Sequence, residues 1–225
     1  MKYAPGYQEM ITLTDGREVL LRAIQANDKA ALVKAFSRLS HESRRRRFFT
    51  SKKELTEQEL KSLTECDGIN HYAIVAGFQP KDEPIEGVGV ARLVRDAKQS
   101  SIAEMAIVVV DQWQGYGIGT LLLKRIIEAA AERGIEHVRA IALPDNEQIQ
   151  HLIAHFSEDV EIVHEKGMVQ MTFPIKAADD ESSLGALFSV LKLAALGTVL
   201  VPLWLGNKSL RHLLGLDKEQ ESDVD

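Results

Sequence analysis

The sequence predicts an α/β domain followed by an apolar helical extension, and three observations carry this prediction. Segments of strand character alternate with segments of helical periodicity over residues 10 to 175. A glycine-rich stretch at residues 114 to 120 joins an apolar strand to a strong helix. Farther on, Leu184–Leu205 runs for 22 residues with Lys192 as its only charge. We therefore expect a folded domain at 1–175, a linker at 176–183, an apolar helical extension at 184–214 and an acidic tail at 215–225.

The composition limits the class of protein. With 225 residues, 45% of them hydrophobic, the chain suits one domain with an appendage. The 27 Lys and Arg against 33 Asp and Glu give a net charge of -6, which argues against a general nucleic-acid binder. Cys66 is the only cysteine, so an intramolecular disulfide and a cysteine metal cluster are both excluded, and we expect no metal. The first ten residues lack the apolar core of a signal peptide, so we expect a cytoplasmic protein.

The first third of the chain should supply one strand and two helices. The strand follows a turn at Asp15–Gly16. Leu32, Val33 and Phe36 lie at helical spacing and indicate an amphipathic helix. The expected elements are a strand at 18–24, a helix at 28–38, a basic segment at 40–49 that is irregular or briefly helical, and a helix at 57–64.

The rest of the domain should add six strands and two helices. Leu122 and Ile126 lie on one side of a strong helix that Gly134 would end as a C-cap. A hairpin should turn at Lys166–Gly167. The expected strands are 71–77, 86–94, 101–110, 137–143, 160–164 and 168–174, and the expected helices are 121–133 and 147–156.

The glycine-rich stretch has the composition of an anion-binding loop. Its glycines leave main-chain N–H groups uncovered, and the positive end of the following helix dipole points at the same place. A dinucleotide fingerprint would need Gly where Thr120 stands, and a P-loop would need Lys before that residue. The alternative is a plain strand-to-helix turn. The residues expected at the anion are Gln114, Gly115, Tyr116, Gly117, Ile118, Gly119 and Thr120.

At this motif the chain resembles the GNAT superfamily of acyl-CoA-dependent N-acyltransferases, through Gln114-x-x-Gly117-x-Gly119. Two further pieces are similar to the acetyltransferase domain of bacterial protein-lysine acetyltransferases. They are Leu39-Ser40-x-Glu42-Ser43 followed by Arg47-Phe48-Phe49, and the stretch from Asp67 to Ala76 that contains His71. The resemblance implies the GNAT fold, a mixed and mostly antiparallel sheet flanked by helices. It also implies acetyl-CoA as co-substrate, with its pyrophosphate in the glycine loop.

Glu104 is the candidate for a catalytic base. An amine is mostly ammonium at neutral pH, so a group must take its proton before it attacks a thioester. Glu104 lies within the apolar strand that leads to the glycine loop, and burial there would raise the pKa of its carboxyl. By strand alternation it shares a face with Ala106 and Val108. The alternative is a solvent-facing glutamate on an edge strand, and the resemblance to lysine acetyltransferases favours the catalytic role.

The resemblance also implies further cofactor contacts. Main-chain groups of Ile107, Val108 and Val109 would pair with the pantetheine arm. Asn146 would help to hold the cofactor, although a plain helix N-cap explains it equally well. The chain departs from the family in the next helix, which contains no Tyr to protonate the leaving thiolate.

His151 and His155 stand in the helix expected at 147–156 and could donate a proton to the leaving thiolate. A histidine on a surface helix usually has no catalytic role, so a general acid is not assigned. The four arginines Arg44–Arg47 either solvate a loop or meet the adenosine 3′-phosphate or an acidic substrate surface. We expect His71 to pack or cap near a strand start rather than to act in catalysis.

The sequence does not decide whether the apolar extension contacts a membrane or a partner protein. As a helix, Leu184–Leu205 would measure about 33 Å, enough to cross a bilayer. Lys192, Gly197 and Pro202 argue against a simple span. An interfacial helix, a shallow hairpin and an apolar arm docked on a partner protein all stay open.

The sequence thus predicts an acetyl-CoA-dependent N-acetyltransferase that acts on a primary amine, with a protein lysine as the leading acceptor. A small-molecule amine is the second candidate acceptor. A non-catalytic acyl-CoA-binding sensor is the alternative from another class of protein.

Overall fold

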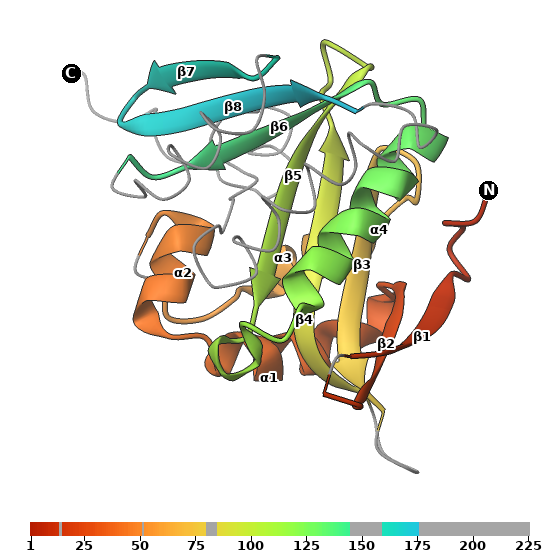
Figure 1. Ribbon diagram of the computed structural model, residues 1–225. Helices are drawn as coiled ribbons and strands as arrows, with labels where there is room; N and C mark the ends of the chain where they lie inside the picture. The colour runs from red at the N-terminus through yellow and green to blue at the C-terminus, as the bar shows by residue number, and fades with distance from the viewer. Residues whose placement is uncertain (14, 51, 80–84, 145–158, 176–225) are drawn as a thin grey trace.

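The computed structural model describes residues 1–175 apart from 14, 51, 80–84 and 145–158, and within this part it forms one mixed sheet with helices on both faces (Figure 1). The N-terminal part contains β1 (Gln8–Thr12), β2 (Glu18–Ala23), the 3-10 turn η1 (Ala26–Asp28), α1 (Lys29–Ser37), α2 (His41–Phe48) and α3 (Glu57–Thr64). It is followed by β3 (His71–Phe78), β4 (Glu86–Arg95), β5 (Ile102–Val109), η2 (Asp111–Trp113), α4 (Ile118–Glu132), β6 (His137–Ala142), β7 (Glu161–Glu165) and β8 (Met168–Pro174).

The sheet has the strand order β1-β2-β3-β4-β5-β6-β8-β7. Every neighbouring pair is antiparallel except β5 with β6, which is parallel. This confirms the expected mixed, mostly antiparallel sheet. The β7–β8 hairpin also turns where expected, because Lys166 and Gly167 both adopt the left-handed conformation that suits a tight two-residue turn.

Two assignments differ from the sequence expectation, and the basic segment takes the briefly helical alternative. The structure adds β1, which pairs with β2 ahead of the first expected strand. The basic segment is helical as α2, because the Ser40 side chain accepts from the Ser43 N–H and caps it. Helix α4 begins at Ile118 rather than Leu121, since Gly117 serves as its N-cap and accepts the Leu121 N–H at 3.0 Å. Ile118, Gly119 and Thr120 therefore lie in the first helical turn.

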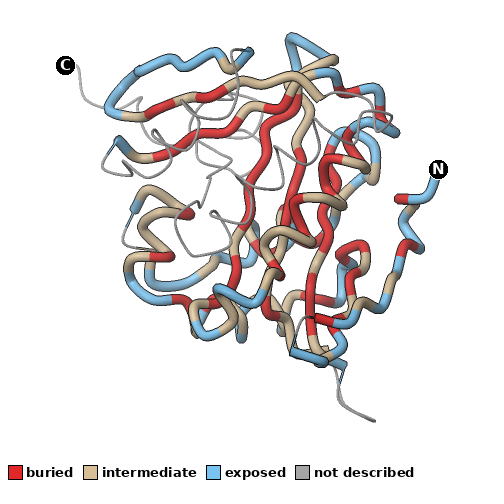
Figure 2. The backbone as a smooth tube through the Cα atoms, viewed as in Figure 1, coloured by how far each residue is buried: buried red, intermediate tan, exposed pale blue. Residues whose placement is uncertain are grey.

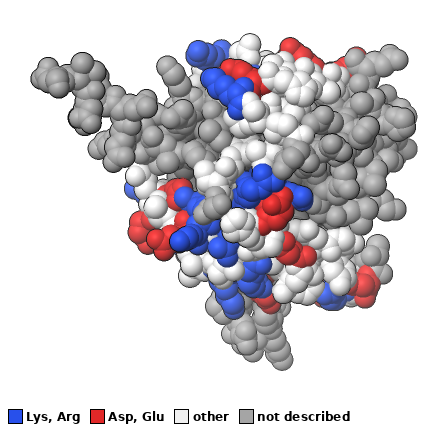
Figure 3. Space-filling view, turned by 90° about the vertical axis from the view of Figure 1, so that its left-hand side faces the viewer, with Lys and Arg blue, Asp and Glu red and all other residues white. Residues whose placement is uncertain are grey.

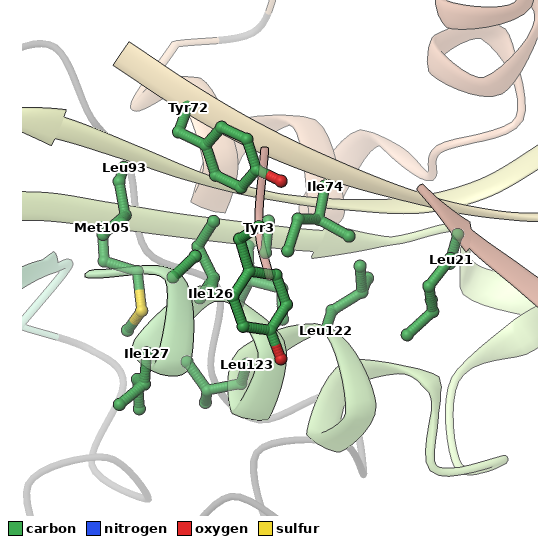
Figure 4. Packing of buried hydrophobic residues seen from close by; sticks show 14 of the residues in the cluster. Tyr3, Leu21, Tyr72, Ile74, Leu93, Met105, Leu122, Leu123, Ile126 and Ile127 are labelled. Atoms are coloured by element: carbon green, nitrogen blue, oxygen red, sulfur yellow. The ribbon is translucent and has the colours of Figure 1, made fainter. Parts of the chain in front are cut away.

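The main core lies between α4 and the central strands (Figure 4). Leu122 and Ile126 of α4 are fully buried against strand side chains such as Ile74 and Met105. Burial is densest in β3–β5 and on the inner side of α4, whereas β7 is exposed along its length (Figure 2). Helices α1 and α2 contact the opposite face of β4 and β5, where Phe36 and Leu39 pack with Val110.

The sheet opens between β5 and β6. The two strands pair only at their starts, and the last pair joins Glu104 to Arg139. Beyond it β5 stays paired with β4 as far as Val109, while β6 continues along β8 as far as Ala142. One edge of β5 is therefore without a strand partner from residue 105 onward, within the part of the chain that the structure describes.

Two sequence expectations fall outside the described residues. They are the helix at 147–156 and everything from residue 176 on, which includes the linker, the apolar extension and the acidic tail. Of the helices in the described ranges, none is both long enough and apolar enough to cross a bilayer.

Candidate active site

The glycine loop connects the end of β5 to the start of α4. Gly115 and Gly117 both have φ of 83°, a left-handed conformation that side chains with a Cβ adopt only under strain. A Cβ built at either position would meet nothing within 4 Å, so the space above the loop is open. The first N–H groups of α4 lie next to this space. They have no hydrogen-bond acceptor within the helix, because the residues that would supply it precede the helix start. The loop thus has the geometry of an anion-binding site.

Two side chains brace the loop from outside. The Gln114 side chain donates from Nε2 to the carbonyl of Val109 at 3.1 Å, which ties the start of the loop to the end of β5. Arg17 lies over the rings of Trp113 and Tyr116, at 4.6 and 4.5 Å from their centroids. Gln114 was expected among the residues at the anion, and its side chain ties the loop to β5.

The open edge of β5 presents main-chain groups of alternate residues. The Val110 N–H donates to Val88 in β4 at 2.8 Å, so by alternation the N–H and C=O of Val108 also face β4. Those of Ile107 and Val109 face the gap toward β6, where Gln114 already occupies the Val109 carbonyl. Of the three expected main-chain contacts, Ile107 is therefore available at the gap through both groups and Val109 through its N–H, whereas the groups of Val108 face β4.

Glu104 lies at the point where the gap begins. It is 1% exposed, and neither carboxylate oxygen has a hydrogen-bond partner within the described residues. Burial raises the pKa of this carboxyl to about 7, against a lowering by Arg139 and a further raising by Asp96. A carboxylate with this pKa is half deprotonated at neutral pH, where a general base is most effective. Of the two alternatives left open by the sequence, the structure shows the buried glutamate and not the solvent-facing one.

Arg139 and Asp96 form an ion pair beside Glu104 that the sequence did not single out. Arg139 Nη1 lies 2.9 Å from Asp96 Oδ2 and 3.9 Å from Glu104 Oε1. Arg139 therefore makes its close contact with Asp96. Its more distant charge reduces, but does not cancel, the rise that burial causes in the pKa of Glu104. Its position opposite Glu104 follows from the β5–β6 register. An arginine within the apolar strand 137–143 was the only sequence signal that could have drawn attention to it.

The arginine run of α2 divides into two groups. Figure 3 looks at the side of the molecule that carries α2, where blue and red atoms lie close together. Arg45 and Arg46 both contact Glu42, at 3.1 and 2.7 Å. Arg44 donates to the Ser37 carbonyl at 2.9 Å. Arg47, in contrast, is buried at 5% exposure.

The other candidate residues have simpler outcomes. His71 packs at the start of β3, where its N–H donates to Asp67 Oδ1 at 2.8 Å, and this fits the expected packing role. Asn146, His151 and His155 lie outside the described residues. Across the described ranges, no group of three or more His, Cys, Asp or Glu side chains is placed to hold a metal ion.

Comparison with known proteins gives consistent matches. A family model described as an acetyltransferase (GNAT) domain matches residues 18–156. The acetyltransferase PA5475 of Pseudomonas aeruginosa is 27% identical over 141 residues, which cover 63% of this chain and 75% of that protein. The acetyltransferase Pat of Mycolicibacterium smegmatis is 29% identical over 136 residues, 60% of this chain but only 40% of that protein. The crystal structure of the GNAT domain of S. lividans PAT aligns with a TM-score of 0.66 at 26% identity, over 74% of this chain and 96% of that one.

Proposed function

The chain belongs to the GNAT acetyltransferase family and is an N-acetyltransferase, and we propose that it transfers the acetyl group of acetyl-CoA to a protein lysine with Glu104 as the base. The observation that carries the proposal is the position of Glu104. This buried carboxylate, which accepts no hydrogen bond from the described residues, lies where β5 leaves β6, on the strand that leads into the glycine loop. Five residues of strand separate it from Val109, about 17 Å along an extended chain.

The co-substrate would lie along this length. The diphosphate fits over Gly115 and Gly117, where the open space and the first amides of α4 favour an anion. The pantetheine arm would pair with the main-chain groups of Ile107 and Val109 in the gap. The thioester would then lie beside Glu104. The acetyl transfer and the binding of the diphosphate would thus take place at opposite ends of the exposed edge of β5.

The proposed reaction needs only the groups described. The Glu104 carboxylate takes a proton from the ammonium group of the acceptor, directly or through one water. The freed nitrogen attacks the thioester carbon, and an N–H at the open edge of β5 stabilises the oxyanion. As the C–S bond breaks, the attacking nitrogen loses its second proton to solvent, giving the neutral amide and coenzyme A thiolate. A thiol has a pKa near 8.5, so the thiolate can leave without a dedicated acid among the described residues.

A protein lysine is the leading acceptor because the sequence motifs resemble those of bacterial protein-lysine acetyltransferases. The similar structure from S. lividans is the GNAT domain of a protein named PAT, and a curated relative is named Pat. A small-molecule amine is the second candidate. A sensor that binds acyl-CoA without turnover is a third, and the Arg139–Asp96 pair beside Glu104 argues against it, since a binding module has no need of a tuned carboxylate.

Glu104→Gln tests the proposal. Calorimetry should show that acetyl-CoA binds the variant and the wild type with the same affinity. Turnover on a panel of proteins and amines should fall at least about 100-fold, the usual contribution of a general base. A wild-type protein that binds acetyl-CoA and acetylates no member of the panel would instead support the sensor. Equal turnover in both forms would remove Glu104 from the mechanism.

For location, we propose a cytoplasmic protein whose segment Leu184–Leu205 contacts a membrane or a partner protein. The apolar composition of that segment supports the proposal. Flotation with liposomes, with and without residues 184–225, separates the two partners. A full-length chain that stays at the bottom of the gradient rejects the membrane.

A further inference from the structure

Two buried arginines lie outside the mechanism described above. Arg47 of α2 is 5% exposed and Arg92 of β4 is 3% exposed. Both line one cavity of about 70 Å³ between α1, α2 and the sheet face opposite α4. The remaining lining is mostly apolar and includes Leu39, Val90 and Val108. The cavity lining also includes Arg22 and Asp28, so Arg47 and Arg92 share a largely apolar enclosure with one further arginine and one carboxylate.

The acceptors that hold Arg92 are all uncharged at neutral pH. Its Nη1 donates to the His71 ring at Nε2 and lies 3.6 Å from Cys66 Sγ, and its Nη2 donates to the Leu63 carbonyl at 2.5 Å. Burial, with the charge of Arg92, lowers the pKa of His71 to about 3, so that ring stays neutral. Burial likewise raises the pKa of the Cys66 thiol. The Nε atom of Arg92 has no partner within the described residues.

Among the described residues, fewer groups compensate the positive charge of Arg47 than that of Arg92. Its guanidinium carbon lies 5.0 Å from the Phe48 ring centroid, and none of the ion pairs between described residues includes it. Burial and the charge of Arg92 lower its pKa to about 9, so it is still charged at neutral pH. Arg22, which lines the same cavity, shows the normal arrangement, because its two terminal nitrogens contact the two oxygens of Asp28 at 2.6 and 2.8 Å.

Among the described residues, Arg47 and Arg92 have no carboxylate of their own, because Asp28 is paired with Arg22, and two such buried positive charges destabilise a fold unless an anion joins them. We propose that Arg47 and Arg92 bind a carboxylate, and that the amine acceptor supplies it. The cavity volume suits a group of about the size of acetate, and its walls suit the carbon chain that carries such a group. A planar carboxylate also matches the two-pronged donor geometry of guanidinium.

The position of Arg92 connects this site to the chemistry. Arg92 pairs with Ala106 across β4 and β5, and Glu104 lies two residues away on the same face of the sheet. Glu104 itself does not line the cavity, so the acceptor must reach along this face of the sheet, with its amine at Glu104 and its carboxylate at the arginine pair. This inference rests on the proposed function and adds the substrate class, which is an amine that carries a carboxylate. A free amino acid and a lysine beside an acidic side chain both present this group.

The test compares acceptors that differ only in the carboxylate. Lysine against cadaverine serves for free amines, and a lysine peptide with a neighbouring Asp against the same peptide with Asn serves for proteins. Calorimetry with coenzyme A present measures binding without turnover. We expect the carboxylate member of at least one pair to bind wild-type protein at least tenfold more tightly, and the pair that shows the preference identifies the source. Equal binding within both pairs contradicts the inference.

Arg47→Met is the informative variant, and Arg44→Met on the same helix is its matched control. Arg47→Met should abolish the preference for the carboxylate and leave binding of the partner without a carboxylate unchanged. It should also raise the Tm of the free protein, because it removes a buried charge that no described residue compensates, whereas a purely structural Arg47 would lower it. Arg44→Met should keep the preference.

A preference that survives Arg47→Met overturns the proposal, and Arg47→Lys, which keeps the charge, should retain part of it. Acetyl-CoA affinity is measured on every variant. Loss of the carboxylate preference with intact acetyl-CoA binding is thereby distinguished from failure of the acetyltransferase assignment.

Discussion

The two faces of β5 carry different tasks although their residues alternate along one strand. On the α4 side, Met105, Ile107 and Val109 are apolar and belong to the main core. On the opposite side, Glu104 is buried without a hydrogen-bond partner, and the neighbouring strand adds Arg92. One face is satisfied by packing alone, while the other holds charges that packing does not satisfy. The fold therefore separates stability from chemistry within eight residues, and substitutions should separate them as well.

The largest expected effect is on the packed face. Met105→Ala removes a side chain that is 4% exposed and should lower the free energy of unfolding by about 2–5 kcal/mol. It should leave the pH dependence of turnover unchanged, since it contacts the core and not the carboxylate. Urea denaturation measures the first quantity, and a pH–rate profile at a temperature where the variant stays folded measures the second. A shifted profile would show that the two faces are not separate.

Its neighbour should behave in the opposite way. The folded-state pKa of Glu104, about 7, lies above its ordinary value of 4.5, so protonation of this carboxyl stabilises the fold. That contribution is complete below about 4.5 and is lost as the pH rises through about 7. Glu104→Gln should therefore raise Tm relative to wild type above pH 7 and make little difference at pH 4.5. A lower Tm at pH 8 would mean that the carboxylate is stabilised by partners and not merely buried.

The glycine loop offers a smaller and more local test. Gly117→Ala places a Cβ at φ of 83°, which costs about 1–2 kcal/mol, and fills part of the open space above the loop. Acetyl-CoA affinity measured by calorimetry should fall about tenfold or more. Gly134→Ala, at φ of 69° on the other end of α4, is the control. It should share the loss of Tm and keep the affinity; an equal loss of affinity in both variants would assign the effect to strain alone.

The smallest expected effect concerns the tuning of Glu104. Arg139→Met removes the cation that lowers the pKa of that carboxyl and leaves the Asp96 charge beside it. The acidic limb of the pH–rate profile should move to higher pH by roughly one unit. Turnover well above pH 8 should change little. A limb that moves to lower pH would show that Arg139 does not act on Glu104 through charge.

Local patterns were enough to predict much of this molecule. The apolar neighbours of Glu104 indicated that its carboxyl could be buried, and the glycines predicted the loop, because both follow from neighbouring residues. The gap between β5 and β6 was not predictable in this way, since it depends on register between segments more than thirty residues apart. The same holds for the Arg139–Asp96 pair. Helix α2 owes its start to Ser40, whose hydroxyl is held by Asp111, 71 residues farther along the chain.

The central claim is that burial turns Glu104 into a base that works at neutral pH, and one titration tests it directly. Carboxyl carbon NMR of protein labelled at glutamate, with Glu104→Gln to assign the signal, follows its protonation as a function of pH. We predict a midpoint near pH 7, coincident with the acidic limb of kcat/KM. A Glu104 signal that titrates at the ordinary 4.5, or a limb that persists in Glu104→Gln, would contradict the account.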